Sequence, residues 1–153
     1  MTFCLDSLII KPENGNEIKN AVILLHGYGG DGSDISMVSL SWKRHMPNTV
    51  FICPNGHEKC VINPTGYQWF DLSKEDPNYI LDQSIKAESK IKQFIEEIKK
   101  KFNLTHHQIC LSGFSQGCMM SLNVGLTSAE KFLCIVGFSG KIIDQNNLKG
   151  RIR

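Results

Sequence analysis

The chain has 153 residues, of which 41% are hydrophobic and 21% are charged, and its formal net charge is +2. This composition is typical of a single globular domain with a buried core, expected here over residues 1–153. So small a net charge gives no strong attraction to nucleic acid or to a membrane surface, and we expect neither as a partner. The N-terminus lacks the features of a signal peptide and no apolar run approaches the ~20 residues of a membrane span, so we expect a cytoplasmic protein without stable membrane insertion.

The first half of the chain predicts three strands, one short helix and a glycine-rich loop. Residues 3–11 alternate loosely and predict the first strand. Ala21–Leu25 is apolar at every position, which is typical of a parallel strand buried on both faces, and it runs into the loop His26–Ser33. The segment Asp34–His45 predicts the helix, and Thr49–Cys53 predicts another short buried strand.

The second half opens with a long irregular segment, Pro54–Asp71, and long loops in compact domains are usually functional. Leu81–Phe102 has apolar residues at three- and four-residue steps and predicts a long helix. A helix is also expected over Gln116–Leu126, and a buried strand over Phe132–Phe138, whereas the tail Lys141–Arg153 shows no element. Strands that alternate with helices predict a three-layer α/β sandwich with a mostly parallel sheet.

The stretch from Ile109 to Met120 contains Gly-x-Ser-x-Gly, with Ser115 between Gly113 and Gly117. An apolar strand, this motif and a following helix together indicate a nucleophile elbow, in which a sharp turn lifts the serine hydroxyl clear of the sheet. Free N–H groups at the start of the helix would stabilise an anion above the serine. The alternative is an ordinary glycine-rich turn with a surface serine. The loop His26–Ser33 and the segment Pro54–Asp71 each follow a predicted strand, so both lie at the carboxyl ends of the strands, where α/β proteins bind ligands.

The cysteines and histidines give no sign of a metal site. None of the six cysteines forms Cys-x-x-Cys, and Cys53, Cys110 and Cys134 lie in apolar runs, so we expect reduced, partly buried thiols. The histidines and cysteines never group at ligand spacing, and the neighbours His106 and His107 would point to opposite sides of an extended chain.

Five short segments, in this order along the chain, resemble the phospholipase/carboxylesterase family, an α/β-hydrolase group that includes small bacterial carboxylesterases and acyl-protein thioesterases. The resemblance covers nearly the whole chain and is more specific than Gly-x-Ser-x-Gly by itself. It implies an α/β-hydrolase domain that uses neither a metal nor an organic cofactor. The segments are Leu25–Gly30, Pro54–Gly56, Gln68–Asp71, Gly113–Gly117 and Phe138–Gly140.

The resemblance also implies roles for single residues. Ser115 is similar to the nucleophile that accepts the acyl group, and the backbone N–H groups of Tyr28 and Gln116 are similar to the oxyanion-hole donors. His26 precedes the oxyanion turn, where it is expected to order the loop. Gln68 and Trp69 belong to a segment that is similar to the one lining the acyl-binding side of the site. Core packing of this aromatic segment under a loop is an equal alternative. The residues that the resemblance places at the substrate are Gly29, Gln68 and Trp69.

Two features depart from the family pattern. Cys118 stands where the family often has a smaller residue, which is a mild change. More seriously, the family places its Asp and His beyond the strand equivalent to Phe132–Phe138, and this chain stops at Arg153 before either could occur. Asp144 comes too early and the tail has no histidine. Because serine needs a neighbouring base and a carboxylate that orients it, the sequence shows the nucleophile and oxyanion half of an active site.

Three hypotheses remain open from the sequence. The first is a shortened serine carboxylesterase that acts on short or medium acyl esters or thioesters through an acyl-enzyme on Ser115. The second is a non-catalytic remnant that binds small acyl ligands or a partner protein, and the third is a fragment completed by a second polypeptide that supplies the Asp and His. If the family's strand order applies, the strand Phe132–Phe138 of the 153-residue chain lies at the edge of the sheet, where an apolar strand invites pairing. The expected partners are therefore a second copy of the chain or a complementing C-terminal fragment, and the DNA after codon 153 would discriminate among the hypotheses.

Overall fold

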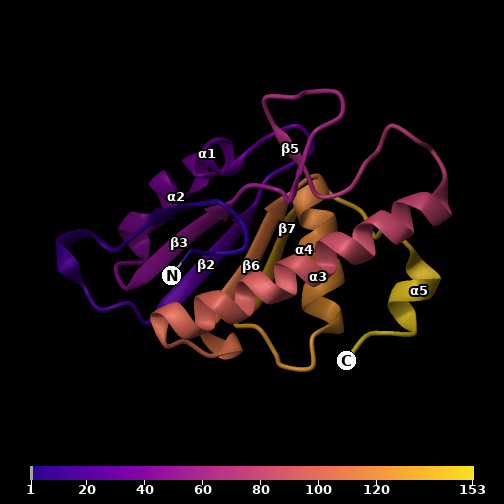
Figure 1. The fold of residues 1–153 in the computed structure, drawn as a ribbon. Coiled ribbons are helices and arrows are strands. Elements are labelled where there is room, and N and C mark those ends of the chain that lie inside the picture. The colour runs from indigo at the N-terminus through magenta and orange to yellow at the C-terminus, as the bar shows by residue number, and fades with distance from the viewer. Residues whose placement is uncertain (1) are drawn as a thin grey trace.

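The computed structural model describes residues 2–153, which build a five-stranded sheet between two layers of helices (Figure 1). The first strand in the order pairs antiparallel with its neighbour, and the other neighbouring pairs are parallel. The mostly parallel sheet expected from the sequence is therefore confirmed. In spatial order the strands are β1 (Ser7–Ile10), β3 (Thr49–Pro54), β2 (Asn20–Leu25), β6 (Ile109–Phe114) and β7 (Cys134–Phe138).

Two helices cover one face of the sheet and two shorter ones cover the other. They are α3 (Pro77–Phe102) and α4 (Gln116–Thr127) on the first face, and α1 (Gly32–Ile35) and α2 (Met37–Trp42) on the second. Successive strand residues alternate between these layers: Ile52 packs with Phe94 of α3, whereas Phe51 packs with the α2 layer around Trp42. Burial on both faces explains why the central strands are apolar at every position.

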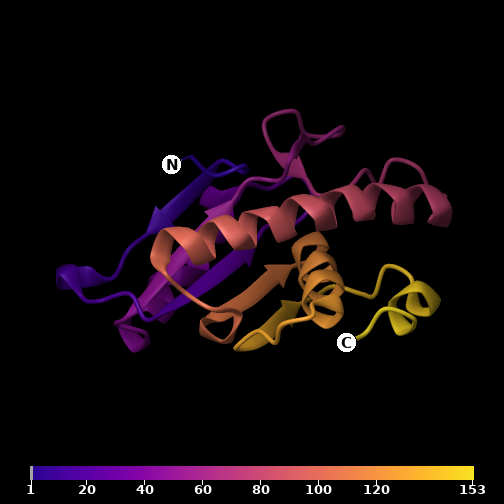
Figure 2. The same cartoon turned by 60° about the horizontal axis from the view of Figure 1, so that its bottom comes forward.

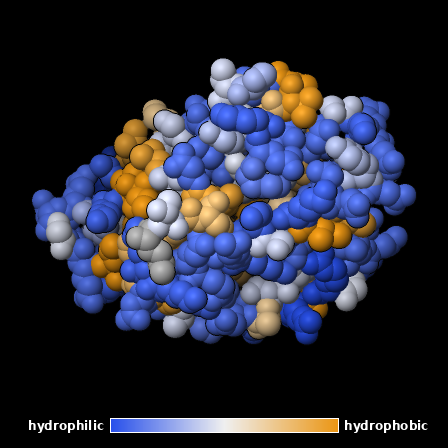
Figure 3. Space-filling view, in the orientation of Figure 1, coloured by the Kyte–Doolittle hydropathy of each residue, from blue (hydrophilic) through white to orange (hydrophobic). Residues whose placement is uncertain are grey.

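The long helix α3 begins four residues before the predicted Leu81. Asp76 accepts hydrogen bonds from the backbone N–H groups of Asn78 and Tyr79, and Pro77 occupies the first helical position, where its missing N–H costs nothing. The helix ends at Asn103 in the left-handed conformation (φ 53°). Figure 3 shows that the face of the molecule carrying α3 is mostly hydrophilic, as expected for a helix with a charged outer side.

The predicted helix over Asp34–His45 is divided into α1, α2 and a 3-10 turn at Lys43–His45. It also starts earlier than expected, inside the glycine-rich loop, because Asp31 caps α1 by accepting from the Asp34 N–H. Gly32 is required at this start, since a Cβ there would lie 2.1 Å from the Cys53 carbonyl oxygen.

Two segments that were expected to lack regular structure contain short elements. Pro54–Asp71 holds a small antiparallel pair, β4 (Glu58–Lys59) and β5 (Tyr67–Gln68). The tail forms α5 (Gln145–Lys149), capped by Asp144, whose carboxylate accepts from the Asn147 N–H at 2.7 Å. The expectation of a tail without an element was therefore wrong.

The strand β7 forms one margin of the sheet, as the sequence predicted, and Figure 2 shows it as the outermost strand beside β6. It begins at Cys134, two residues later than expected, and Phe132 instead packs edge-on against His106. Cys53 and Cys110 are buried, and burial raises the pKa of each thiol to about 12. Cys134 is exposed, contrary to expectation, because it lies on this margin.

Among the described residues, no helix combines the length and apolar composition that a membrane span requires.

Candidate active site

Ser115 lies at the turn between β6 and α4, with backbone angles φ 53° and ψ −115°. A residue other than glycine adopts such angles only when the surrounding structure enforces them. Here the strand and helix cross so closely that a Cβ on Gly113 would lie 2.2 Å from the Gly117 carbonyl carbon, and a Cβ on Gly117 would lie 2.0 Å from the Leu25 oxygen. The Ser115 N–H is held by the Phe138 carbonyl at 2.8 Å. The local geometry is that of a nucleophile elbow.

The loop after β2 lies directly against this turn. A Cβ on Gly27 would come within 3.4 Å of the Ser115 Cβ. The N–H groups of Gly29 and Gly30 are taken by the carbonyl oxygens of Tyr67 and Gly27. By contrast, the described residues contain no hydrogen-bond acceptor for the N–H of Tyr28 or for that of Gln116 at the start of α4. These are the two donors that the family resemblance assigns to the oxyanion hole, and that role stays a prediction.

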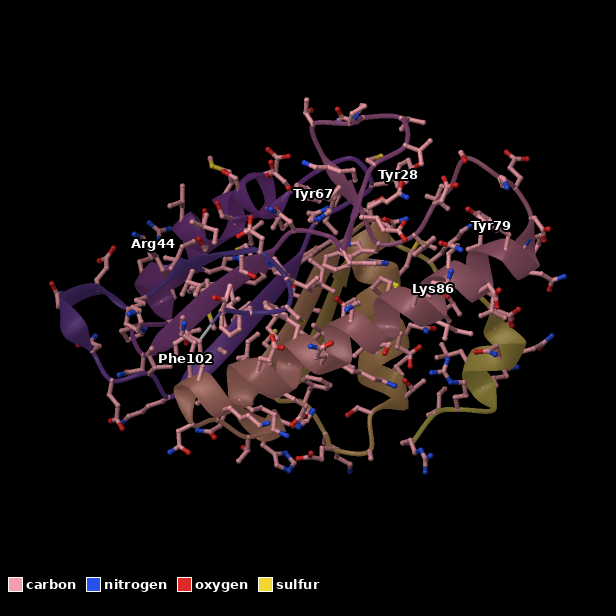
Figure 4. All side chains as sticks on the ribbon, in the orientation of Figure 1. Tyr28, Arg44, Tyr67, Tyr79, Lys86 and Phe102 are labelled. Atoms are coloured by element: carbon pink, nitrogen blue, oxygen red, sulfur yellow. The ribbon has the colours of Figure 1, made fainter. Side chains whose placement is uncertain are left out.

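The β4–β5 pair holds this loop in place. Tyr67 accepts from the Gly29 N–H at 2.9 Å and donates its own N–H to the Gly30 carbonyl at 2.8 Å. The amide of Asn63 also donates to the Gly29 carbonyl at 2.8 Å. Gly29 has φ +82°, a backbone conformation that favours glycine. Figure 4 shows Tyr28 and Tyr67 together beyond the carboxyl ends of the strands. Gly29 thus shapes the turn, and its contact with substrate stays a prediction.

The side chains of Gln68 and Trp69 are buried and make internal hydrogen bonds. The Gln68 amide accepts from the Val61 N–H and donates to Glu58, which closes the β4–β5 loop. The Trp69 indole N–H donates to the His26 carbonyl at 2.9 Å, and the indole stacks on the His26 ring. These positions favour the packing alternative for both residues, and direct contact with an acyl chain stays a prediction.

His26 orders the loop, as its place before the turn suggested. Its Nε2 accepts from the Gly56 N–H at 2.8 Å, so the proton of the neutral ring is on Nδ1, which donates to the Gly27 carbonyl at 2.7 Å. Burial lowers the pKa of His26 and favours this neutral form. With both ring nitrogens engaged, His26 has no free position to take a proton from Ser115.

The amide of Gln116 is a feature that the sequence reasoning missed. This buried side chain accepts from the Trp69 N–H at 2.8 Å and donates to the Phe70 carbonyl at 2.7 Å. It therefore ties the first turn of α4 to the loop over the site. The residue that follows the nucleophile was singled out only for its backbone N–H, and no local pattern signals the second role.

Among the described residues, no histidine or carboxylate makes a hydrogen bond to the Ser115 hydroxyl. Each of the three buried or half-buried histidines contacts another residue through at least one ring nitrogen, and the remaining two are exposed. Asp144 is engaged as the cap of α5. Cys118, which departs mildly from the family pattern, packs closely against two glycines. A Cβ on Gly137 would lie 2.5 Å from the Cys118 sulfur, and a Cβ on Gly140 would lie 2.6 Å from the Cys118 Cβ. Of the buried or half-buried histidines, His26 accepts from the Gly56 N–H, His57 lies 3.4 Å from the Glu58 carboxylate, and His106 lies 3.2 Å from the Glu130 carboxylate.

One group of side chains has the donor atoms of a cation site, at the opposite end of the sheet from the turn. Glu96, His106 and Glu130 bring ligand atoms within 4.8 Å of one another. Spacing along the sequence did not reveal this group, because the fold assembles it from three separate segments. Lys99 already donates to both carboxylates, at 3.0 and 3.2 Å, so its side-chain ammonium group supplies the positive charge there. The group is an ion-pair network centred on Lys99.

The amino-acid sequence and the fold of this chain are similar to those of known esterases and thioesterases. The phospholipase/carboxylesterase family model matches residues 7–152. Acyl-protein thioesterase 1 of Candida albicans is 37% identical over 95% of this chain and 67% of its own length. The namesake protein of Schizosaccharomyces pombe is 31% identical over 92% of this chain and 63% of its own length. A crystal structure of esterase PE8 superposes with a TM-score of 0.90, at 34% identity, over 97% of this chain and 69% of that one. The chain thus spans about two thirds of the length of these relatives.

Proposed function

Because the chain belongs to the phospholipase/carboxylesterase family, we propose that it carries the nucleophile and oxyanion half of a serine hydrolase of carboxylic esters. The observation that carries the proposal is the conformation of Ser115, held at φ 53° between two glycines that admit no side chain. The turn brings Ser115 against the loop that carries Tyr28, and the N–H groups of Tyr28 and Gln116 have no acceptor among the described residues. An ordinary glycine-rich turn would need neither feature.

In the proposed reaction, the Ser115 hydroxyl oxygen attacks the carbonyl carbon of the ester. Negative charge then develops on the carbonyl oxygen, which accepts hydrogen bonds from the N–H groups of Tyr28 and Gln116. One such donor is typically worth ~3–4 kcal/mol of barrier. The tetrahedral intermediate expels the alcohol or thiol and leaves an acyl group on Ser115. Water then attacks the acyl-enzyme, releases the carboxylic acid and restores the hydroxyl.

A base must take the Ser115 proton and return it to the leaving group, and a carboxylate must orient that base. Among residues 2–153, no histidine or carboxylate makes a hydrogen bond to the Ser115 hydroxyl, so we propose that both come from polypeptide outside this range. The third of the Candida albicans relative that has no match here is a source of the right size. Without them, the chain is a scaffold that binds acyl groups and turns them over slowly.

The proposed substrates are short or medium acyl esters or thioesters. The names of the relatives include both an esterase and thioesterases, so the class of leaving group stays open between oxygen and sulfur. A hollow of about 270 Å³ next to the turn, between the Gly27–Tyr28 loop and Phe114, has room for a small acyl group. No step of the proposed reaction uses a metal or an organic cofactor.

The test is a fusion of residues 1–153 to the unmatched third of the Candida albicans relative, assayed on p-nitrophenyl butyrate. We expect Ser115→Ala to lower the rate of the fusion at least about 10⁴-fold, because the nucleophile is removed while the fold is kept. The matched control is Ser128→Ala, which changes the serine at the other end of α4 and should leave the rate unchanged. Turnover of the Ser115→Ala fusion at near the parent rate would refute the assignment.

A further inference from the structure

The hollow next to the nucleophile turn has a carboxylate in its wall. Asp34, in the short helix α1, lines this hollow together with Gly27 and Tyr28 of the loop after β2. One Asp34 carboxylate oxygen would lie 3.5 Å from a Cβ on Gly30, so the carboxylate lies against this loop. The Asp34 N–H donates to Asp31, but no hydrogen bond or ion pair among the described residues involves the Asp34 carboxylate. The carboxylate is therefore available to a ligand.

The local fold gives no other reason for a carboxylate at this position. Asp31 already caps α1 by accepting from the Asp34 N–H at 2.8 Å. The helix has only four residues, so its dipole gives a second carboxylate little stabilisation. Burial lowers the pKa of His26, and the charges of Asp31 and Asp34 oppose this shift, so their negative charge reaches the loop. None of the described residues that line the hollow is a lysine or an arginine that would balance this charge.

The residues around this carboxylate are largely aromatic and apolar. Tyr28, Ile35 and Phe114 line the hollow with Asp34. Phe114 is 47% exposed, and its Cδ1 would lie 3.3 Å from a Cβ on Gly27, so the ring lies beside the loop that carries the Tyr28 N–H. Aromatic rings attract alkylammonium groups, and a nearby carboxylate adds a direct attraction between opposite charges. The hollow is therefore suited to a cationic amine and unfavourable for an anion.

We propose that the substrates of this site carry a positively charged group, an amine or a quaternary ammonium, that lies in the hollow against Asp34. The inference rests on the proposed function, because it names the charge of the acyl group that Ser115 would accept. A short acyl group with an ammonium end is small enough for a hollow of about 270 Å³. An uncharged acyl group of the same shape would lack the attraction to Asp34, and one that ends in a carboxylate would be repelled.

The experiment titrates residues 1–153 with choline and with the uncharged alcohol in which a carbon atom replaces the choline nitrogen, and follows the backbone amide signals by NMR. We expect choline to bind at least about 5-fold more tightly and to shift the signals of Gly27, Tyr28 and Ile35. Added salt should reduce this preference, because it screens the charges. Asp34→Asn should abolish the preference, since it removes the charge but keeps the N–H that caps α1. The matched control is Asp82→Asn, which removes an exposed carboxylate of α3 and should keep the preference.

Equal binding of the two alcohols overturns the proposal, as does choline binding too weak to detect. So does a preference that Asp34→Asn leaves unchanged, or signal shifts confined to other parts of the chain. Asp34→Ser, which also lacks the charge, is the second variant if Asp34→Asn folds poorly. Choline binding requires no hydrolysis, so the test is separate from that of the proposed function. A Ser115→Ala fusion that keeps its rate refutes the proposed function, whereas the absence of a choline preference refutes only the charge of the substrate.

Discussion

Ser115 shows how a single residue depends on its neighbours for its conformation. The angles φ 53° and ψ −115° are held from three sides: by the Phe138 carbonyl on the Ser115 N–H, and by the close approaches at Gly113 and Gly117. Strain of this kind costs of order 1–3 kcal/mol and persists only where the surroundings over-determine it. The motif can therefore be recognised in the sequence, because sterics restrict which residues can stand at Gly113, Ser115 and Gly117.

Gln116 carries the first prediction at this scale. Gln116→Ala leaves the Trp69 N–H and the Phe70 carbonyl without their buried partner, and each unsatisfied group costs about 1–3 kcal/mol. We expect urea unfolding to show a loss of roughly 2–4 kcal/mol. The control is Gln93→Ala, which removes an exposed amide on α3 and should cost less than about 0.5 kcal/mol. Equal losses in the two variants would contradict a stabilising role for the hydrogen bonds that Gln116 makes to Trp69 and Phe70.

At the scale of elements, a buried carboxylate joins three helical segments. Glu88 of α3 accepts from Asn123 of α4 at 2.8 Å, from Lys92 at 2.6 Å, and from Arg151 just beyond α5. Burial by itself would raise the pKa of Glu88, but the hydrogen bonds from Lys92 and Arg151 outweigh it and hold the pKa below 4.5. The short helix α5 is thereby attached to the body of the molecule.

The prediction for this network concerns pH. Because the folded pKa of Glu88 is depressed, its contribution to stability is present above the unfolded pKa and is lost as pH falls through the folded value. We expect the free energy of unfolding to fall below about pH 4.5, and less steeply in Glu88→Gln. At pH 7, Arg151→Ala should cost about 1–3 kcal/mol, whereas Lys149→Ala on exposed α5 should cost almost nothing. An unchanged acid slope in Glu88→Gln would refute this account.

At the scale of the whole molecule, the proposed function assigns a nucleophile and two oxyanion donors to residues 2–153 and places the base outside them. Residual catalysis then comes only from binding and the oxyanion hole, and loss of triad members typically costs ~10⁴–10⁶ in rate. We expect residues 1–153 by themselves to hydrolyse p-nitrophenyl acetate at near-background rate and to be labelled only weakly by a fluorophosphonate. EDTA should change neither readout. A fully active monomer of residues 1–153 would overturn the argument, and a strong requirement for a divalent ion would overturn the cofactor-free mechanism.

Several features could be predicted from the sequence because they depend on short-range patterns. Apolar runs such as Ala21–Leu25 identify strands buried on both faces, and regular three- and four-residue spacing identifies α3. The glycines around Ser115 identify the turn, since only glycine tolerates such close backbone crossings. The family resemblance then supplied the candidate roles of Tyr28 and Gln116, which local pattern could not.

Only the tertiary structure decided the remaining features, because they join residues far apart in the chain. The Gln116 amide meets a loop 46 residues away, and Glu88 meets Arg151 across 63 residues. The hollow lined by Leu24, Trp42 and Phe138 likewise depends on which strands are neighbours and on where each helix ends. No local periodicity encodes such distances, since the energy of a buried hydrogen bond or an uncovered apolar face depends on what the folded chain brings next to it.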